Sequence, residues 1–198
     1  MPRQVDYEER RVRIADAVCA LIARSGMEAV SLRDVAAEAD VSMGAVQRCF
    51  RTKEDMLLFA LEHVSRHVGE RADRRIAAAS EPQAAATLLW HTLAGVALLD
   101  AESRAQAHVW LAFVGHAPAS GRLSAVLRET YAKLHDLVVW IVRYGQDTGE
   151  IPRHFDAVQE ARSLLTVADG LTVQVLAGHQ SPETARAVLQ RHIGHLLG

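Results

Sequence analysis

Prolines divide this chain into long segments that have the composition of helices. After Pro2, prolines occur only at Pro82, Pro118, Pro152 and Pro182. A proline in a helix interior costs about 3 kcal/mol, whereas the first turn of a helix accepts one. Between these points Ala, Leu, Arg, Glu and Gln are abundant, and no long stretch alternates apolar and polar residues. The sequence therefore predicts an all-α protein.

The composition is that of an ordinary globular protein. Of its 198 residues, 49% are apolar and 23% are charged. The formal net charge of -2 excludes a uniformly basic nucleic-acid coat, although it leaves room for a local basic patch. The two cysteines, Cys19 and Cys49, are too few for a disulfide scaffold or a four-thiolate zinc site.

No segment has the character of a membrane span or a secretion signal. The longest uncharged run covers residues 84–99, which is shorter than the roughly 20 apolar residues that a spanning helix needs. The first residues, MPRQVDYEERR, contain no apolar signal core. We therefore expect a cytoplasmic protein with no membrane partner.

Helix signals repeat along the chain. Gly26 follows the first amphipathic segment, and Ser31, Ser42 and Thr52 are suitable N-caps for the next three. Asp156 and Ser181 are suitable N-caps near the C-terminus. These signals predict about nine helices, over residues 7–25, 32–39, 43–50, 53–79, 83–99, 102–116, 121–147, 157–177 and 183–197. A change in composition near residue 80 separates a polar N-terminal module from an apolar C-terminal bundle.

The segment 31–53 carries the most specific motif. Two short predicted helices flank a turn at Asp40, Val41 and Ser42. Small and apolar residues are placed so that the two helices can pack together, namely Val35, Ala36, Ala39, Val41, Val46 and Cys49. This spacing is typical of a helix-turn-helix, with a third helix before it.

Packing of that kind leaves a polar face exposed on the second short helix. Gln pairs with adenine and Arg with guanine when such a helix lies in the major groove of DNA. Side chains at helix N-termini suit phosphate contacts. The predicted DNA-binding residues are therefore Ser31, Arg33, Ser42, Met43, Gly44, Gln47, Arg48 and Lys53.

The sequence VSLRDVAAEADVSMGAVQRCFRTKEDML, which occupies residues 30–57, resembles the N-terminal domain of TetR/AcrR-type transcriptional regulators. Segments 102–105, 109–113, 145–151 and 168–171 are similar to the BetI-type ligand domain of that family. The resemblance implies a repressor that binds a palindromic operator and is released by a small-molecule effector. It also implies a division into a DNA-binding domain at 1–52, a connecting helix at 53–79 and a ligand-binding and dimerisation domain at 80–198.

Two positions depart from the family pattern. Family members usually have Tyr where this chain has Gln47, and His or Tyr where it has Cys49. That Tyr commonly contacts a phosphate, so Gln47 leaves open whether the contact is kept. The departure predicts an operator preference that differs from that of better-known relatives.

Specific recognition of a genome requires two copies of the module. One recognition helix reads only a few base pairs, so two must lie about 34 Å apart on one face of the duplex. The last two predicted helices are apolar on faces that can pair with a second chain. The predicted dimer contacts are Leu164, Ala168, Leu171, Val175, Val188, Leu189 and Leu196. The alternative is that both faces close a bundle within one chain.

The middle of the chain holds most of the aromatic residues. Aromatic side chains that line a cavity between helices would suit an apolar or cationic ligand. The predicted ligand-binding residues are Trp90, His91, Trp110, Phe113, Tyr131 and Trp140. Ordinary core packing is the alternative for each of them. BetI itself responds to choline, but the resemblance does not carry that identity over, because pockets diverge faster than folds.

Three other functions compete with this interpretation. His63 and His67 are four residues apart, which is a possible zinc-ligand spacing, but the HExxH motif is absent. No Gly-rich phosphate loop, GxSxG or Cys-His-acid set points to catalysis. Cys49 on the recognition helix could act as a redox switch, although a small buried residue is the simpler account. We therefore expect no enzyme activity, no cofactor and no metal.

Overall fold

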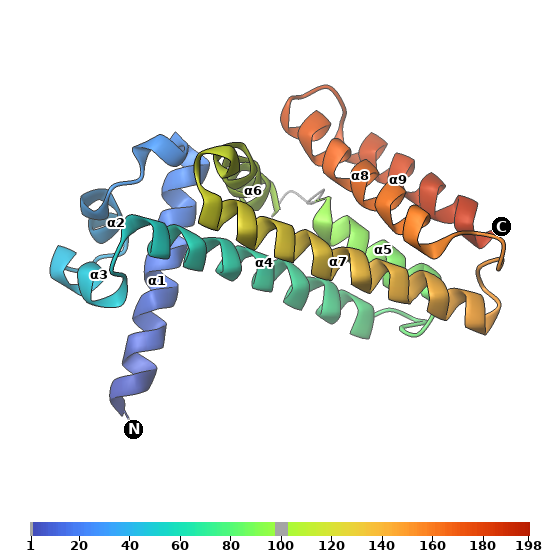
Figure 1. The fold of residues 1–198 in the computed structure, drawn as a ribbon, viewed down its shortest axis with the longest axis horizontal. Coiled ribbons are helices and arrows are strands. Elements are labelled where there is room, and N and C mark those ends of the chain that lie inside the picture. The colour runs from blue at the N-terminus through green and yellow to red at the C-terminus, as the bar shows by residue number, and fades with distance from the viewer. Residues whose placement is uncertain (1, 98–102) are drawn as a thin grey trace. The chain divides into compact units, whose positions relative to one another are not determined.

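The computed structural model describes residues 2–97 and 103–198, and in this part of the chain it is all-α (Figure 1). No strand occurs in these residues, so the predicted fold class is confirmed. The α-helices are α1 (Pro2–Ser25), α2 (Leu32–Glu38), α3 (Met43–Cys49), α4 (Lys53–Ala77), α5 (Ala85–Val96), α6 (Arg104–His116), α7 (Gly121–Thr148), α8 (Ala157–Leu176) and α9 (Pro182–Leu197). The 3₁₀ helices η1 (Met27–Ala29) and η3 (Ala117–Ala119) lie between these α-helices.

Local side-chain caps start most of these helices where the sequence places them. Ser42 accepts a hydrogen bond from the Ala45 amide, and Ser181 accepts one from the Thr184 amide. The Asp156 carboxylate accepts from two amides in the first turn of α8. Because each cap involves residues two or three positions apart, its signal is present in the sequence.

The α5 start has a different origin. Its N-cap, Ala84, has no side chain that can accept a hydrogen bond. Instead the Glu150 carboxylate accepts from the Ala85 amide at 2.7 Å, across 65 residues of sequence. A cap supplied from so far along the chain leaves no local signal, and the helix starts two residues later than predicted.

Other boundaries also differ from prediction. α1 begins at Pro2 rather than Tyr7, since a proline is accepted in the first turn. The predicted end at Leu99 and the predicted start at Glu102 lie outside the described residues. The 3₁₀ helices were not predicted, because three residues are too few to show a periodic pattern.

The chain forms two compact units, each built from two stretches of sequence. The first comprises residues 1–66 and 105–126, and the second comprises 67–104 and 127–198. α4 contributes its N-terminal part to the first unit and its C-terminal part to the second. A functional division near residue 80 stays a prediction.

In the first unit α1, α2 and α3 contact one another (Figure 1). Ile14, Val18 and Ile22 on α1 are buried, as are Val35 on α2 and Val46 on α3. These side chains supply the apolar burial that holds three short elements together. The first turns of α1 extend beyond α3 (Figure 1).

In the second unit α8 and α9 lie side by side, and both contact α5 (Figure 1). The core is formed by buried residues of α5, α7, α8 and α9, including Leu89, Leu93, Val142, Leu164 and Leu189. Thr172 on α8 is buried and donates a hydrogen bond from its hydroxyl to the Ala97 carbonyl at 2.8 Å. This bond joins α8 to the end of α5.

Candidate DNA-binding site

The turn between α2 and α3 has a defined backbone geometry. The Val41 amide donates a hydrogen bond to the Ala36 carbonyl at 3.0 Å. Asp40 adopts a positive φ of 50°, a conformation that Asp and Asn tolerate better than most residues. Ser42 then caps α3. These contacts fix the direction in which α3 leaves the turn.

The inner faces of the two helices are packed as predicted. Val35 and Ala36 on α2 are buried, and so are Ala45, Val46 and Cys49 on α3. Val41 in the turn is half-buried. The helix-turn-helix packing predicted from residue spacing is therefore confirmed.

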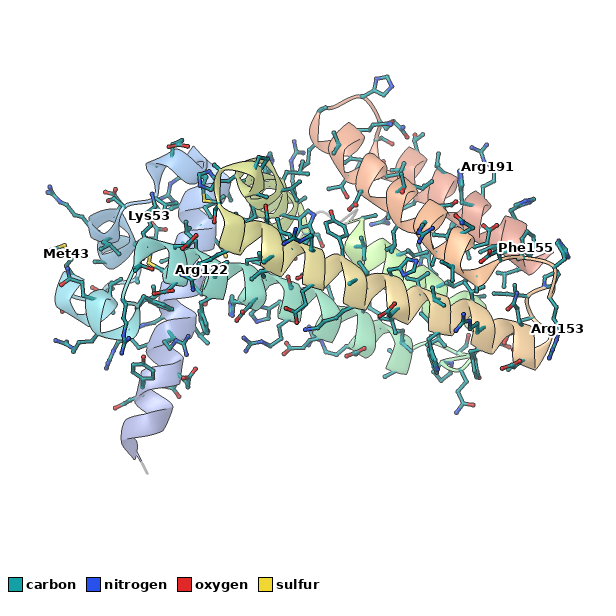
Figure 2. The ribbon with its side chains drawn as sticks, viewed as in Figure 1. Met43, Lys53, Arg122, Arg153, Phe155 and Arg191 are labelled. Carbon is teal, nitrogen blue, oxygen red and sulfur yellow. The ribbon has the colours of Figure 1, made fainter. Side chains whose placement is uncertain are left out.

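The outer face of α3 is polar and exposed. Met43 is 50% exposed at the tip of the unit (Figure 2), and Gln47 and Arg48 are exposed one turn further on. The Arg48 guanidinium lies back along the helix, with Nη1 3.7 Å from where a Cβ on Gly44 would stand. A side chain at Gly44 would therefore contact the Arg48 side chain. Glycine at this position adds no side chain to the surface of α3. These residues form one continuous face of the kind that reads base edges.

Residues predicted to contact phosphates lie at the edges of that face. Arg33 is exposed in the first turn of α2, and Lys53 is the exposed first residue of α4 (Figure 2). Ser31 is also exposed, but its hydroxyl donates to the Asp34 carboxylate and accepts from the Asp34 amide. Ser31 thus acts first as the cap of α2, and its predicted phosphate contact depends on a remaining lone pair.

A contact that the sequence does not reveal joins α1 to the end of α3. The Tyr7 hydroxyl donates to the Cys49 carbonyl at 3.3 Å. The Arg11 guanidinium lies over the Phe59 ring at 4.0 Å from its centroid and near the Phe50 ring at 5.3 Å. Such cation–π contacts are worth about 0.5–2 kcal/mol. No local pattern connects residues that are more than 30 positions apart.

A second contact outside the motif holds the start of α4. Arg122 (Figure 2) at the start of α7 pairs with the Glu54 carboxylate at 3.0 Å and with that of Asp55 at 2.9 Å. The Ser120 hydroxyl donates to Glu54 at 2.6 Å. The bonds from Ser120 and then Arg122 lower the pKa of Glu54. This cluster fixes the turn of α4 that begins with Lys53.

The predicted ligand-binding residues are divided between the two units. Trp110 and Phe113 belong to the first unit, and the other four belong to the second. Phe113 has no exposed surface, which is consistent with the core packing that the sequence left as an alternative. Trp140 is 56% exposed, and its ring stacks on that of Tyr144. The assignment of all six as ligand-binding residues stays a prediction.

Most of the predicted dimer contacts are buried within the chain's own core. They are Leu164, Ala168, Leu171, Leu189 and Leu196. Their assignment as dimer contacts stays a prediction, and Leu164 also lines a groove between α8 and α9. They pack against the other helices of the second unit, which is the alternative that the sequence left open. Val175 and Val188 are half-buried and keep some accessible surface.

The metal and redox alternatives gain no support. His63 is only 3% exposed, and its Nε2 lies 2.7 Å from the Asp16 carboxylate, so it does not form a surface pair with His67. No group of three or more potential metal ligands occurs in the described residues. Burial raises the pKa of the Cys49 thiol, against the opposite influence of nearby arginines, which disfavours the reactive thiolate. Within the described ranges, none of the helices is long and apolar enough to cross a bilayer.

Comparison with known proteins places this arrangement in a family. Residues 14–59 match the description "Bacterial regulatory proteins, tetR family", and residues 85–198 match "BetI-type transcriptional repressor, C-terminal". The chain is 25% identical to the regulator PksA of Bacillus subtilis over 199 residues, covering 98% of this chain and 92% of PksA. It is 30% identical to BetI of Paraburkholderia phymatum over 176 residues, covering 86% of this chain and 83% of that protein.

Solved structures agree with the sequence comparison. A TetR-family regulator from Rhodococcus sp. superposes with a TM-score of 0.86 at 25% identity, covering 96% of this chain and all of that one. A regulator from Saccharomonospora viridis, solved in complex with choline, gives a TM-score of 0.83 at 26% identity, covering 95% and 97%. With a matched N-terminal module and a match over more than half of its length, the chain belongs to the TetR family of DNA-binding transcriptional regulators and carries a BetI-type C-terminal domain.

Proposed function

We propose that this protein represses transcription by binding a palindromic operator as a homodimer, and that a small-molecule effector releases it. The observation that carries the proposal is the exposed face of α3, where Met43, Gln47 and Arg48 project from a capped and packed helix-turn-helix. This function uses binding rather than catalysis. It places the protein in the cytoplasm, the compartment that holds the operator.

The chemistry and position of each exposed residue indicate whether it contacts bases or phosphates of the DNA. Gln47 and Arg48 have the donors and acceptors that pair with adenine and guanine edges, so we assign them base contacts. Arg33, Ser42 and Lys53 lie at or near helix N-termini and suit phosphate oxygens. Ser31, Met43 and Gly44 complete the proposed surface. The contacts of Tyr7 and Arg11 hold α1 against α3 and α4 and so help to fix the position of the proposed DNA-binding surface.

For the homodimer we propose the outer surface of α8 and α9. A groove of about 290 Å³ lies between these helices, lined by Glu160, Ser163, Leu164, Arg191, His192 and His195. Val173 is 47% exposed on the same pair of helices. A Cβ added at Gly170 or Gly194 would have no atom within 4 Å, so both sites leave room for a second chain to approach closely. Val175 and Val188 remain in the proposed interface.

Two relatives support a small-molecule effector. HdnoR of Paenarthrobacter nicotinovorans is named a nicotine-responsive repressor and is 26% identical over 184 residues. The Saccharomonospora viridis regulator was solved with choline. In this chain α4 is one continuous helix that contributes residues to both units. We therefore assign α4 the role of transmitting effector binding to the helix-turn-helix.

The decisive experiment measures binding to the promoter of the protein's own gene by fluorescence anisotropy. Gln47→Ala and Arg48→Ala should weaken specific binding by about 1–3 kcal/mol and leave non-specific binding nearly unchanged. Lys53→Ala should weaken both kinds of binding and reduce the slope of log affinity against log salt by about 1. Arg74→Ala serves as the control, because Arg74 is an exposed arginine in the second unit.

Two results would overturn the proposal. One is a protein that stays monomeric and binds no duplex, including one selected from random sequences. The other is an unchanged sequence preference in both the Gln47 and the Arg48 variants, which would show that α3 does not face the bases.

A further inference from the structure

The first turn of α4 places two acidic side chains directly after a residue proposed to bind a phosphate. Lys53, Glu54 and Asp55 follow one another in the chain, and all three lie in this turn. Lys53 is exposed, and none of the described residues forms an ion pair with it. A carboxylate beside the DNA backbone repels the phosphates. Unless they are neutralised, the two acidic side chains would oppose the attraction between Lys53 and a phosphate.

A single arginine neutralises both carboxylates. Arg122 lies at the start of α7 (Figure 2), with its Nη1 3.0 Å from the Glu54 Oε2 and its Nη2 2.9 Å from the Asp55 Oδ1. The Ser120 hydroxyl donates to the other Glu54 oxygen, Oε1, at 2.6 Å. A guanidinium suits this role because its nitrogens lie in one rigid plane and donate in two directions at once. The two carboxylates are thus held by α7 and by the residue before it.

Both carboxylates carry a full charge that Arg122 has to balance. Hydrogen bonds from Ser120 and then Arg122 lower the pKa of Glu54. Hydrogen bonds from Thr52 and then Arg122 lower the pKa of Asp55. The Arg122 side chain is 57% exposed, so water and salt screen the cluster and its contribution to stability is small. Loss of Arg122 would therefore leave two negative charges beside the proposed phosphate contact without unfolding the protein.

The two halves of this cluster belong to different parts of the family pattern. Glu54 and Asp55 lie within the N-terminal match, and Ser120 and Arg122 lie within the BetI-type C-terminal match. All four residues nevertheless belong to the first compact unit, which also contains the helix-turn-helix. Residues of the C-terminal match therefore contact the helix that begins with Lys53.

We propose that Arg122 is a positioning residue for operator binding. It holds the first turn of α4 and neutralises the two carboxylates there, so that Lys53 binds a phosphate. Arg122 acts through Lys53 and does not itself touch the DNA. This role rests on the proposed function, because it concerns the same DNA-binding surface. The alternative is an ion-pair cluster that only stabilises the fold, and the two roles differ in the salt dependence of DNA binding.

The test measures operator affinity by fluorescence anisotropy over a series of salt concentrations. It compares the full-length wild type, Arg122→Gln, Lys53→Ala and the double variant. Arg122→Gln should weaken operator binding by about 3- to 10-fold, as expected for one charge-assisted contact at an exposed site. It should also reduce the slope of log affinity against log salt by about 1, as Lys53→Ala does. The double variant should stay within about 2-fold of the weaker single variant, with the slope again reduced by about 1, because the same phosphate contact is lost in all three.

Two further variants separate position from net charge. Arg128→Gln is the matched control, since it removes the same charge from an exposed position further along α7, and it should change operator affinity by less than about 2-fold. Arg122→Lys keeps the charge but lacks the rigid fork that spans two carboxylates, so it should restore part of the affinity. It also carries the test if Arg122→Gln does not fold. Urea midpoints of the variants should lie close to that of the wild type, because the cluster is exposed.

An Arg122→Gln protein with wild-type operator affinity and salt slope would overturn the proposal. So would a double variant in which the two losses multiply and the slope falls by about 2, because Arg122 would then act on DNA independently of Lys53. An equal loss in Arg128→Gln would overturn it as well, by showing an effect of net charge alone. All three results leave the proposed function intact, since the wild type still binds its operator. A wild-type protein that binds no operator counts against the proposed function instead.

Discussion

The hydroxyl of Tyr7 donates a hydrogen bond to the backbone carbonyl of Cys49, 3.3 Å away, and so joins α1 to the last residue of the proposed recognition helix. That carbonyl lies at the C-terminal end of α3, where no further turn of helix can supply a donor. The contact ties the orientation of α3 to the first helix of the chain.

Tyr7→Phe removes this bond and little else. We expect it to lower the free energy of unfolding by about 0.5–1.5 kcal/mol, the usual net value of one hydrogen bond, and towards the lower end because Tyr7 is partly exposed. Operator affinity should fall as well, since α3 loses a positional constraint. Urea titration and anisotropy measure the two effects, and equal values for the variant and the wild type would show that the bond has no role.

Gly145 is the tightest glycine in the second unit. A Cβ there would lie 2.7 Å from the Ile151 Cδ1 and 2.9 Å from the Ala85 Cβ. Gly145→Ala should therefore cost about 1–3 kcal/mol of stability through overpacking, despite the better helix propensity of Ala. Gly69→Ala on α4 has open space around the new methyl group and should instead stabilise by up to about 1 kcal/mol.

A double-mutant cycle separates this steric clash from other causes. In an Ile151→Ala background the added methyl group finds room, so Gly145→Ala should cost less there than in the wild type. Urea unfolding of the four proteins gives the coupling energy. If the stability losses of Gly145→Ala and Ile151→Ala simply add, the contact with Ile151 is not the cause of the loss in Gly145→Ala.

His91 gives the second unit a pH dependence. Its pKa in the folded protein is lowered, first by burial and then by Arg75. The unfolded chain therefore takes up the proton more readily, so this part of the stability is present above the ordinary histidine pKa and is lost as pH falls through the folded value. His91→Gln should lose less stability than the wild type between pH 7.5 and pH 5.5, as measured by urea midpoints. Identical losses would contradict the assignment.

Both thiols should be slow to react in the folded protein. Burial, with a smaller contribution from Asp16, raises the pKa of Cys19 to about 12, and burial raises the pKa of the Cys49 thiol as well. At pH 8 a thiol with the Cys19 pKa is ionised to about one part in ten thousand, and the thiolate is the reactive form. Ellman's reagent should label the native protein far more slowly than the urea-unfolded protein. Rapid labelling of native Cys49 would revive the redox alternative.

Local interactions explain how much of the helix-turn-helix could be predicted from the sequence. Ser31, Ser42 and Thr52 each accept a hydrogen bond from an amide three residues ahead, so the helix starts are encoded within a few positions. The spacing of Val35, Ala36, Val46 and Cys49 fixes which faces of α2 and α3 are buried. The exposed face with Gln47 and Arg48 follows directly from that periodicity.

For the C-terminal helices, local sequence patterns do not predict which surfaces pack together. The apolar stripes of α8 and α9 are visible in the sequence, but periodicity does not say which partner covers them. The structure packs Leu164, Leu171 and Leu189 against other helices of the same chain, and the proposed dimer surface therefore includes the outer sides of α8 and α9. In the same way, residue type alone did not distinguish the exposed Trp140 from the buried Phe113.

The sequence by itself therefore determined the all-α class, the helix-turn-helix and its polar face, because caps, prolines and helical periodicity act over a few residues. Only the tertiary structure decided which apolar faces are free and which charges meet. The Tyr7–Cys49 bond, the Glu150 cap on Ala85 and the pairing of Arg122 with Glu54 each join separate elements. Contacts of that kind depend on how whole helices pack, and no short stretch of sequence records them.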